Sequence, residues 1–226
     1  KVDGHRFAAQ ALERGAAAVL VEAGSKELGT IEAGDPVVSV ADSYTAMIRL
    51  AKLWRDSVMA TRIGITGSNG KTTTKEMTFT LLSAVARGVF RSPGNLNNLF
   101  GAPLALFGMP RETKYAVLEM GVSIPGEMAK LGDIVRPHLV AITNVGATHL
   151  EFLGSVEGVA REKLSLAENA DAEVKLIVNA DDVFLMREAK RVKQELVTFG
   201  VNQPATFRAE QVERQPDGST NVVIEI

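Results

Sequence analysis

The chain's 226 residues are 46% hydrophobic and 23% charged, with a net charge of −2, which is typical of a globular protein with one large domain or two modest ones. Acidic and basic residues are mixed along the chain, which argues against a basic face for nucleic acid or membranes, and no apolar run approaches the ~20 residues that span a bilayer. The absence of cysteine excludes disulfides, thiolate metal sites and a cysteine nucleophile, and it fits a protein of the reducing cytoplasm.

The first part of the chain, residues 1–58, contains two helical and two strand patterns. Residues 5–15 and 42–58 place apolar side chains at helical spacing, the second behind an Asp or Ser N-cap. Residues 16–22 and 36–41 are short apolar runs typical of buried strands. Two strands and two helices are few for an independent α/β domain, so we expect this part to be a fragment of a domain.

The second part, from residue 61 on, alternates strands and helices in longer units. The predicted strands cover residues 62–66, 115–121, 138–146 and 174–180. The predicted helices cover residues 71–87, 125–135, 156–169 and 181–194. Continuous apolar strands between helices predict an α/β fold with a mostly parallel sheet covered on both faces. Three further strand patterns fill residues 195–226, with a turn at PDGS, and we expect them to form an antiparallel edge.

The segment GSNGKTT lies between the first predicted strand of this part and its helix, which is the context of a phosphate-binding loop. Gly67 and Gly70 can adopt backbone angles closed to other residues, so successive amides can form an anion nest at the helix N-terminus. Lys71 would bring its charge to the β- and γ-phosphates, and Thr72 a hydroxyl to Mg²⁺.

The predicted nucleotide-binding residues of the loop are Gly67, Ser68, Asn69, Gly70, Lys71, Thr72 and Thr73. The strict pattern G-x-x-x-x-G-K-[ST] requires glycine where this chain has Ile65, so the motif is met imperfectly. The alternative is a glycine-rich turn before an ordinary helix.

The loop sequence TGSNGKTTTKEM resembles the ATP loop of the Mur ligases, the amide-forming enzymes of peptidoglycan precursor assembly. The same family is indicated by the segments GNLNNLFGAPLAL, AVLEMGVSIPGEM, AITNVGATHLEFLGS, VAREKLSL and VNADD. The resemblance runs almost continuously from about residue 61 to 200. NLNN and LEMGVSIPGE favour the member that joins D-Ala-D-Ala to UDP-MurNAc-tripeptide over the member that adds the third amino acid.

The resemblance implies a domain organisation. Residues 1–58, with the segment DGHRFAAQALERGAAAVLVE, would be the end of the N-terminal UDP-substrate-binding domain, and residues 59–226 the central ATP-binding domain. The C-terminal domain of the family would be absent, and we expect the chain to be a piece of a longer protein. The implied protein is a cytoplasmic, monomeric ligase that uses ATP and two Mg²⁺ ions and binds neither nucleic acid nor membrane.

Two of the expected metal ligands follow strands. Glu119 ends the strand 115–121, and a carboxylate at the carboxyl end of a parallel strand can bind Mg²⁺ beside phosphates; a solvated strand-end acid is the alternative. His149 follows the strand 138–146, and the resemblance implies that it helps to bind a second Mg²⁺ and takes part in catalysis. Imidazole is an unusual Mg²⁺ ligand, and a helix cap is the alternative.

Lys163 lies on a predicted helix, and its position alone predicts an ordinary surface lysine. The resemblance implies that it is carbamylated by carbon dioxide and acts with Lys71 in catalysis and as a metal ligand. That reaction requires the neutral amine, so the site must lower the amine's pKa or trap the product. Arg161 and Glu162 are its neighbours in the motif, but only an amine has the right chemistry.

Amide and acidic side chains complete the predicted site. Asn95, Asn97 and Asn98 form a polar cluster that could meet phosphate or the incoming amine, and we expect Asn98 to contact the nucleotide; a turn is the alternative. For Asn179 and Asp182 the resemblance implies adenine or ribose contacts, and an N-cap at the next helix is the alternative.

Other functions stay open at this point. A sister ligase that adds the third amino acid, or a folylpolyglutamate ligase, would share the loop, Glu119 and Lys163. A regulatory P-loop NTPase is another class, although the strand ends in LEMG and no clear N-K-x-D motif follows. A non-catalytic nucleotide-binding module is the third alternative.

Overall fold

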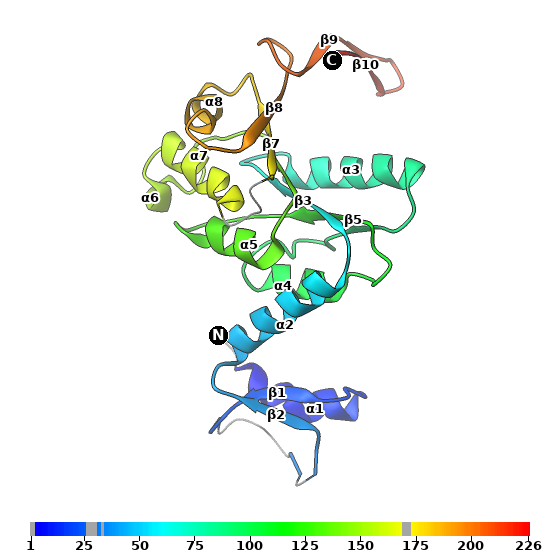
Figure 1. The fold of residues 1–226 in the computed structure, drawn as a ribbon, viewed down its shortest axis with the longest axis vertical. Coiled ribbons are helices and arrows are strands. Elements are labelled where there is room, and N and C mark those ends of the chain that lie inside the picture. Colours follow the sequence, from blue (N-terminus) through cyan, green and yellow to red (C-terminus); the bar gives the residue numbers. More distant parts are fainter. Residues whose placement is uncertain (1–2, 26–30, 33, 169–172) are drawn as a thin grey trace. The chain divides into compact units, whose positions relative to one another are not determined.

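The computed structural model describes residues 3–25, 31–32, 34–168 and 173–226 (Figure 1). The chain divides into two compact units, Lys1–Leu53 and Trp54–Ile226, and the division falls inside the helix α2, Ser43–Ser57. Among the described residues, no helix combines the length and the apolar character that crossing a membrane requires.

The first unit holds one small parallel sheet. Its elements before α2 are the 3₁₀ helix η1 (Gly4–Phe7), α1 (Ala8–Glu13), β1 (Val19–Glu22) and β2 (Val37–Val40). β1 and β2 pair in parallel, and α1 packs against β1 through a core of Ala8, Val19 and Val21. The predicted helix 5–15 is thus a 3₁₀ turn followed by a short helix.

The second unit is built on an eight-stranded sheet with the order β10-β9-β8-β7-β6-β3-β5-β4. Its strands are β3 (Thr61–Thr66), β4 (Val89–Arg91), β5 (Tyr115–Glu119), β6 (Leu139–Ile142), β7 (Lys175–Asn179), β8 (Glu195–Gly200), β9 (Phe207–Arg214) and β10 (Thr220–Glu225). All neighbouring pairs are parallel except β9 and β10. Successive residues of β3 and β5 are buried, so helices or loops cover both faces, and the predicted parallel α/β fold is confirmed.

The helices of this unit lie between the strands in sequence (Figure 1). They are α3 (Lys71–Val85), α4 (Gly101–Phe107), α5 (Glu127–Val135), α6 (Leu150–Leu153), α7 (Val156–Leu164), the 3₁₀ helix η2 (Ser165–Ala167) and α8 (Val183–Ala189). Three elements were not predicted from the sequence: β4, α4 and α6. The predicted antiparallel edge is only partly right, because β8 and β9 continue the parallel sheet and the hairpin β9–β10 alone is antiparallel.

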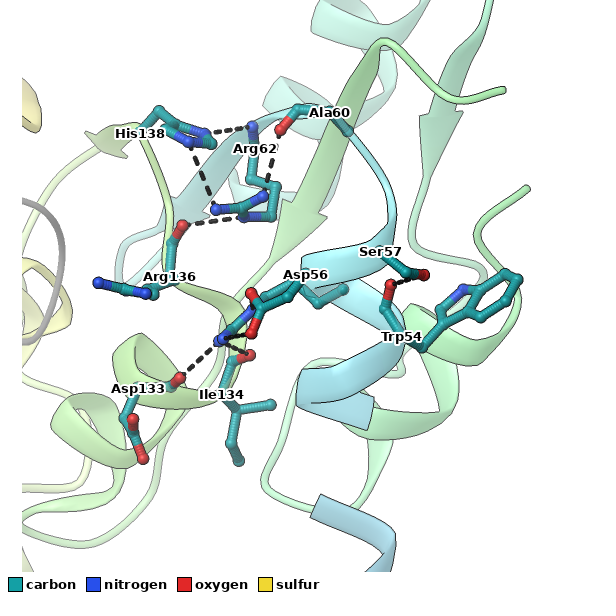
Figure 2. Close-up of polar contacts among 10 residues, drawn as sticks. Trp54, Asp56, Ser57, Ala60, Arg62, Asp133, Ile134, Arg136 and His138 are labelled. Carbon is teal, nitrogen blue, oxygen red and sulfur yellow. Dashed lines mark hydrogen bonds and ion pairs between the residues drawn. The ribbon is translucent and has the colours of Figure 1, made fainter. Parts of the chain in front are cut away.

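Two arginines contact carbonyl oxygens at the end of α5: Arg55, near the end of α2, and Arg62, which lies on β3 and is labelled in Figure 2. Arg55, which is only 3% exposed, donates from Nη1 to the carbonyl oxygen of Ile134 at 2.7 Å. Arg62 donates from Nε to the carbonyl oxygen of Arg136 at 2.9 Å, and its amide donates to Nδ1 of His138. Guanidinium groups thus satisfy carbonyl oxygens at a helix C-terminus, which favours positive charge. These bonds fix β3, and with it the glycine loop, relative to α5.

Candidate active site

The glycine loop between β3 and α3 needs its two glycines for different reasons. Gly67 has φ 152°, and a Cβ there would lie 1.9 Å from Oγ1 of Thr143, so no side chain fits. Gly70 is the N-cap of α3 with φ 81°, and a Cβ there would meet open space. At Gly70 the backbone angle alone requires glycine.

The loop's first amides are already paired inside the protein. The amide of Ser68 donates to the carbonyl oxygen of Asn144 at 2.9 Å, and the amide of Asn69 donates to Oδ1 of the same residue at 3.0 Å. The amides of the first turn of α3 have no intrahelical acceptor and face the helix N-terminus, which favours an anion. Of the amides predicted to form an anion nest, those of Ser68 and Asn69 are therefore engaged within the protein. The amides of Lys71, Thr72 and Thr73 at the start of α3 are left for an anion.

Lys71 folds back over this loop. Its Nζ donates to the carbonyl oxygens of Gly67 at 2.8 Å and Ser68 at 3.2 Å. These carbonyls hold the ammonium group at the mouth of the loop, where a phosphate would meet it. A phosphate bound at the helix N-terminus would replace neutral acceptors by charged ones, which form stronger hydrogen bonds to lysine.

Glu119 has the position expected of a metal ligand. It is the last residue of β5, is only 3% exposed, and its Oε2 accepts from Oγ1 of Thr72 at 2.9 Å. Its Oε1 accepts from Nδ2 of Asn97 at 2.9 Å. A hydroxyl and a carboxylate beside a phosphate site are the hard oxygen donors that Mg²⁺ prefers, so these residues fit the ion.

The described part of the chain shows no complete set of acidic, histidine or cysteine ligands for a metal. Among the described residues, no group of three or more His, Cys, Asp or Glu side chains could hold a metal ion. A magnesium ion at Thr72 and Glu119 would have to complete its coordination with phosphate oxygens and water, as is usual for Mg²⁺ that arrives with a nucleotide.

A cavity of about 400 Å³ opens in front of the loop. It is lined by Gly67, Ser68, Lys71, Asn97, Asn98, Gly121, Val122, Ser123, Ile124, Glu127, Thr148, His149 and Lys163. It brings together four side chains that the sequence singled out from separate segments: Lys71, Asn98, His149 and Lys163. His149 is exposed and has φ 55° as the N-cap residue of α6, but its side chain makes no cap hydrogen bond, so the imidazole is available to the cavity.

The three consecutive residues of the lysine motif point in different directions. Arg161 is 61% exposed in its side chain and approaches Glu188 of α8 at 3.9 Å. Glu162 accepts from the amides of Gly126 and Met128, both at 2.9 Å, and so caps the start of α5. Lys163 alone of the three lines the cavity.

Lys163 is held in a site that disfavours its positive charge. The residue is only 4% exposed, and burial lowers the pKa of its amine to about 8, with repulsion from Lys71 adding to the effect and Glu162 opposing it. A substantial fraction of the amine is therefore neutral near pH 8, the form that attacks carbon dioxide. The predicted carbamylation has the nucleophile it needs.

The remaining predicted residues are engaged in turns and caps. Oδ1 of Asn98 accepts from the amides of Phe100 and Gly101, while its side chain also lines the cavity. The carbonyl oxygen of Asn95 accepts from the amide of Asn97. This segment therefore forms a turn, and Asn98 within it also lines the cavity.

Asn179 and Asp182 do not line the loop cavity. Asp182 is the N-cap of α8: Oδ1 accepts from the amide of Leu185 at 2.9 Å, and Oδ2 accepts from the amide of Val145 at 2.6 Å. Asn179 donates to the carbonyl oxygen of Thr143 at 3.2 Å and lines a separate, mostly apolar cavity of about 260 Å³. The N-cap role of Asp182 is thus observed, and the nucleotide contacts of Asn179 and Asp182 stay predictions.

The comparisons with known proteins identify the family. A model of the Mur ligase middle domain matches residues 65–226. The chain belongs to the Mur ligase family. It is 36% identical over 219 residues to UDP-N-acetylmuramoyl-tripeptide--D-alanyl-D-alanine ligase of Bacillus subtilis, covering 97% of this chain and 46% of that protein.

Solved structures agree with this assignment. MurF from Acinetobacter baumannii matches with a TM-score of 0.84 and 31% identity, over 99% of this chain and 48% of that one. MurF ligase from Thermotoga maritima in complex with ADP matches with a TM-score of 0.84 and 32% identity, over 99% of this chain and 50% of that one. This Mur ligase chain thus spans about half the length of the relatives that it matches.

Proposed function

We propose that this chain is the nucleotide-binding part of an ATP-dependent ligase that joins D-Ala-D-Ala to UDP-MurNAc-tripeptide in peptidoglycan precursor synthesis. The Bacillus subtilis relative named above carries that activity in its name. The observation that carries the proposal is the cavity at the glycine loop, which Lys71, His149 and Lys163 line. Next to Lys71, Thr72 donates to Glu119.

The proposed domains follow from the same likeness. Residues 1–58 would be the end of the UDP-substrate-binding domain, and residues 59–226 the central ATP-binding domain; a C-terminal domain that receives the incoming amine would lie outside this chain. We propose cytoplasmic monomers without nucleic-acid or membrane partners.

The reaction would join two anions, the substrate carboxylate and the γ-phosphate of ATP. The oxygen of the tripeptide carboxylate would attack the γ-phosphorus, ADP would leave, and the amine of D-Ala-D-Ala would displace phosphate from the acyl phosphate to form the amide. Repulsion between the two anions must be cancelled first, and Mg²⁺ would supply part of that positive charge. The chain's own residues position the phosphates and cancel charge, which is most of the catalysis in phosphoryl transfer.

Each residue has a proposed part in this scheme. The amides of the first turn of α3 would hold the β- and γ-phosphates, and Lys71 would leave its loop carbonyls to bind them. Thr72 and Glu119 would hold one Mg²⁺; Thr72 can donate its proton to Glu119 and still offer lone pairs to the ion. His149 and carbamylated Lys163 would approach a second ion, with Asn98 near the phosphates and Asn179 near the base.

The experiment is a coupled assay of ADP release. The full-length protein that contains this chain should release ADP only when both UDP-MurNAc-tripeptide and D-Ala-D-Ala are present, and single D- or L-amino acids and glutamate should not replace the dipeptide. ADP release with meso-diaminopimelate, lysine or glutamate as the amine would identify a sister ligase. Hydrolysis without any amine would indicate a regulatory NTPase instead.

A further inference from the structure

Helix α3 contains a buried lysine, Lys75, whose charge the proposed mechanism does not use. Lys75 is 1% exposed, which is unusual for a lysine and costly unless its charge is compensated. Its Nζ donates to the carbonyl oxygens of Ser92 at 3.1 Å and Gly94 at 3.2 Å. It also lies 3.3 Å from Oε1 of Glu76, which is 42% exposed in its side chain and pairs with Arg91 as well, and 3.7 Å from Oε2 of the buried Glu119.

Lys75 and Thr72 reach the same carboxylate oxygen. They are three residues apart on α3, so they share a face of the helix, and Thr72 donates to Oε2 of Glu119 at 2.9 Å. Asn97 holds the other oxygen from the opposite side. The carboxylate therefore has an ammonium, a hydroxyl and an amide around it, and its negative charge is compensated without any metal ion.

The same ammonium group fixes the segment that leads into the cavity. Its two carbonyl acceptors belong to residues 92–94, and the side chain of Ser92 accepts from the amide of Glu119 at 3.1 Å. Asn97 follows shortly after, and its carbonyl oxygen accepts from the amide of Gly121 at 2.7 Å. Lys75 thus connects α3, the asparagine segment and the end of β5 at one point.

We propose that Lys75 is a positioning residue that serves as a built-in counter-ion: it holds Glu119 and the asparagine segment in place before the nucleotide arrives, and a magnesium ion takes over part of its charge when it binds. The part that concerns magnesium rests on the proposed function, whereas the coupling of Lys75 to Glu119 does not. Removal of one member of a buried ion pair leaves an uncompensated charge, and that is the physical basis of the test.

The test is a double-mutant cycle of Lys75→Met and Glu119→Gln, followed by thermal unfolding in EDTA. We expect Lys75→Met to lower the melting temperature by about 10 °C, because breaking a buried pair is costly in a domain of this size. The double variant should melt well above Lys75→Met alone, since the unpaired carboxylate is gone. Lys175→Met, which removes an exposed lysine paired with Glu195, is the matched control and should leave the melting temperature nearly unchanged.

The second measurement is a magnesium titration of the melting temperature with ADP present. In Lys75→Met the ion supplies the missing charge, so the deficit should shrink and half-maximal stabilisation should need about fivefold less magnesium, as expected for coupled sites. If the wild type and Lys75→Met depend equally on magnesium, the part of the proposal that concerns magnesium is wrong. If the double variant still melts above Lys75→Met in that case, the pairing of Lys75 with Glu119 stands.

The proposal fails if the double variant melts at or below Lys75→Met, because Lys75 would then act through the two carbonyl oxygens and Glu76 and not through Glu119. Should Lys75→Met not fold, recovery of folded protein in the double variant supports the counter-ion, and failure of both variants to fold overturns it. Absence of ligase activity in the full-length protein would count against the proposed function alone, since the cycle in EDTA needs no substrate.

Discussion

Replacement of Lys163 by methionine should stabilise the unmodified protein at neutral pH. The side chain is 4% exposed and lies in a site where burial and the charge of Lys71 both act against its ammonium form. Methionine has nearly the same length and carries no charge. The variant therefore removes the unfavourable charge and keeps most of the packing.

The magnitude follows from the pKa of the amine. A pKa lowered from 10.5 to about 8 corresponds to about 3 kcal/mol of unfavourable free energy for the charged amine in the folded protein. Below pH 8 the amine of Lys163 is charged in both states and the folded protein bears the whole penalty. Between about pH 8 and 10.5 the unfolded state binds more protons, so the free energy of unfolding rises with pH, and above that window the penalty is gone.

Urea unfolding of both proteins at several pH values, in buffers free of carbon dioxide, measures this effect. At pH 7 Lys163→Met should be more stable than the wild type by about 3 kcal/mol at most, and the difference should close by about pH 10.5. Lys130→Met, at an exposed position of α5, is the control and should show no such trend. Bicarbonate added near pH 8 should stabilise the wild type and not Lys163→Met, because only the amine can be carbamylated.

A difference between the wild type and Lys163→Met that does not change with pH would refute this reasoning. So would a variant that is less stable than the wild type at pH 7, since packing or an unseen hydrogen bond would then outweigh the charge.

Four further substitutions test the loop and its surroundings. Gly67→Ala should lower the free energy of unfolding in urea by about 3 kcal/mol or more and abolish ADP binding. Gly70→Ala, whose Cβ would meet open space, should lower it by about 1 kcal/mol. Equal losses in the two variants would contradict the close contact at Gly67. Thr72→Val removes the hydroxyl donor to Glu119 and should weaken ADP binding about 10-fold or more in calorimetry with Mg²⁺, but little in EDTA. Asp182→Ala should lower the free energy of unfolding by about 2 kcal/mol through the lost cap, with ADP affinity unchanged; a folded variant with weakened ADP binding would show instead that this carboxylate contacts the nucleotide.

The sequence predicts the helices and strands that are determined by their own residues rather than by distant contacts. β3 and β5 are short runs with successive buried residues, and α3 starts directly after a glycine that adopts a left-handed backbone. The missed elements lack such signals. β4 has only three residues, and α4 begins within a segment rich in Asn, Gly and Pro that is typical of a turn. The order and direction of the strands cannot be predicted from hydrophobic periodicity either. β8 and β9 would show the same pattern of apolar residues in a parallel or an antiparallel pair.

The candidate site shows the same division. Glu119 could be predicted because the end of a parallel strand is a known position for ligands. The burial of Lys75 could not, because a single lysine in a helix normally indicates a solvated side chain. Only the spacing of Thr72 and Lys75 on one helix face hints that both meet the same partner. For Asp182 the cap and the nucleotide contact have identical sequence signals and can both be true; the structure shows the cap, and the contact stays a prediction.

The three lysines near the loop have different surroundings. Lys75 compensates Glu119 directly, Lys71 is held by neutral carbonyl oxygens, and Lys163 has a lowered pKa because it is buried near Lys71. Each ligand that we propose for the cavity, whether a phosphate, a substrate carboxylate or a carbamate on Lys163, is an anion that the ammonium group of Lys71 would attract. Carbamylation would replace a disfavoured ammonium by a carboxylate near Lys71, so the modification and the binding of a metal-nucleotide should favour each other.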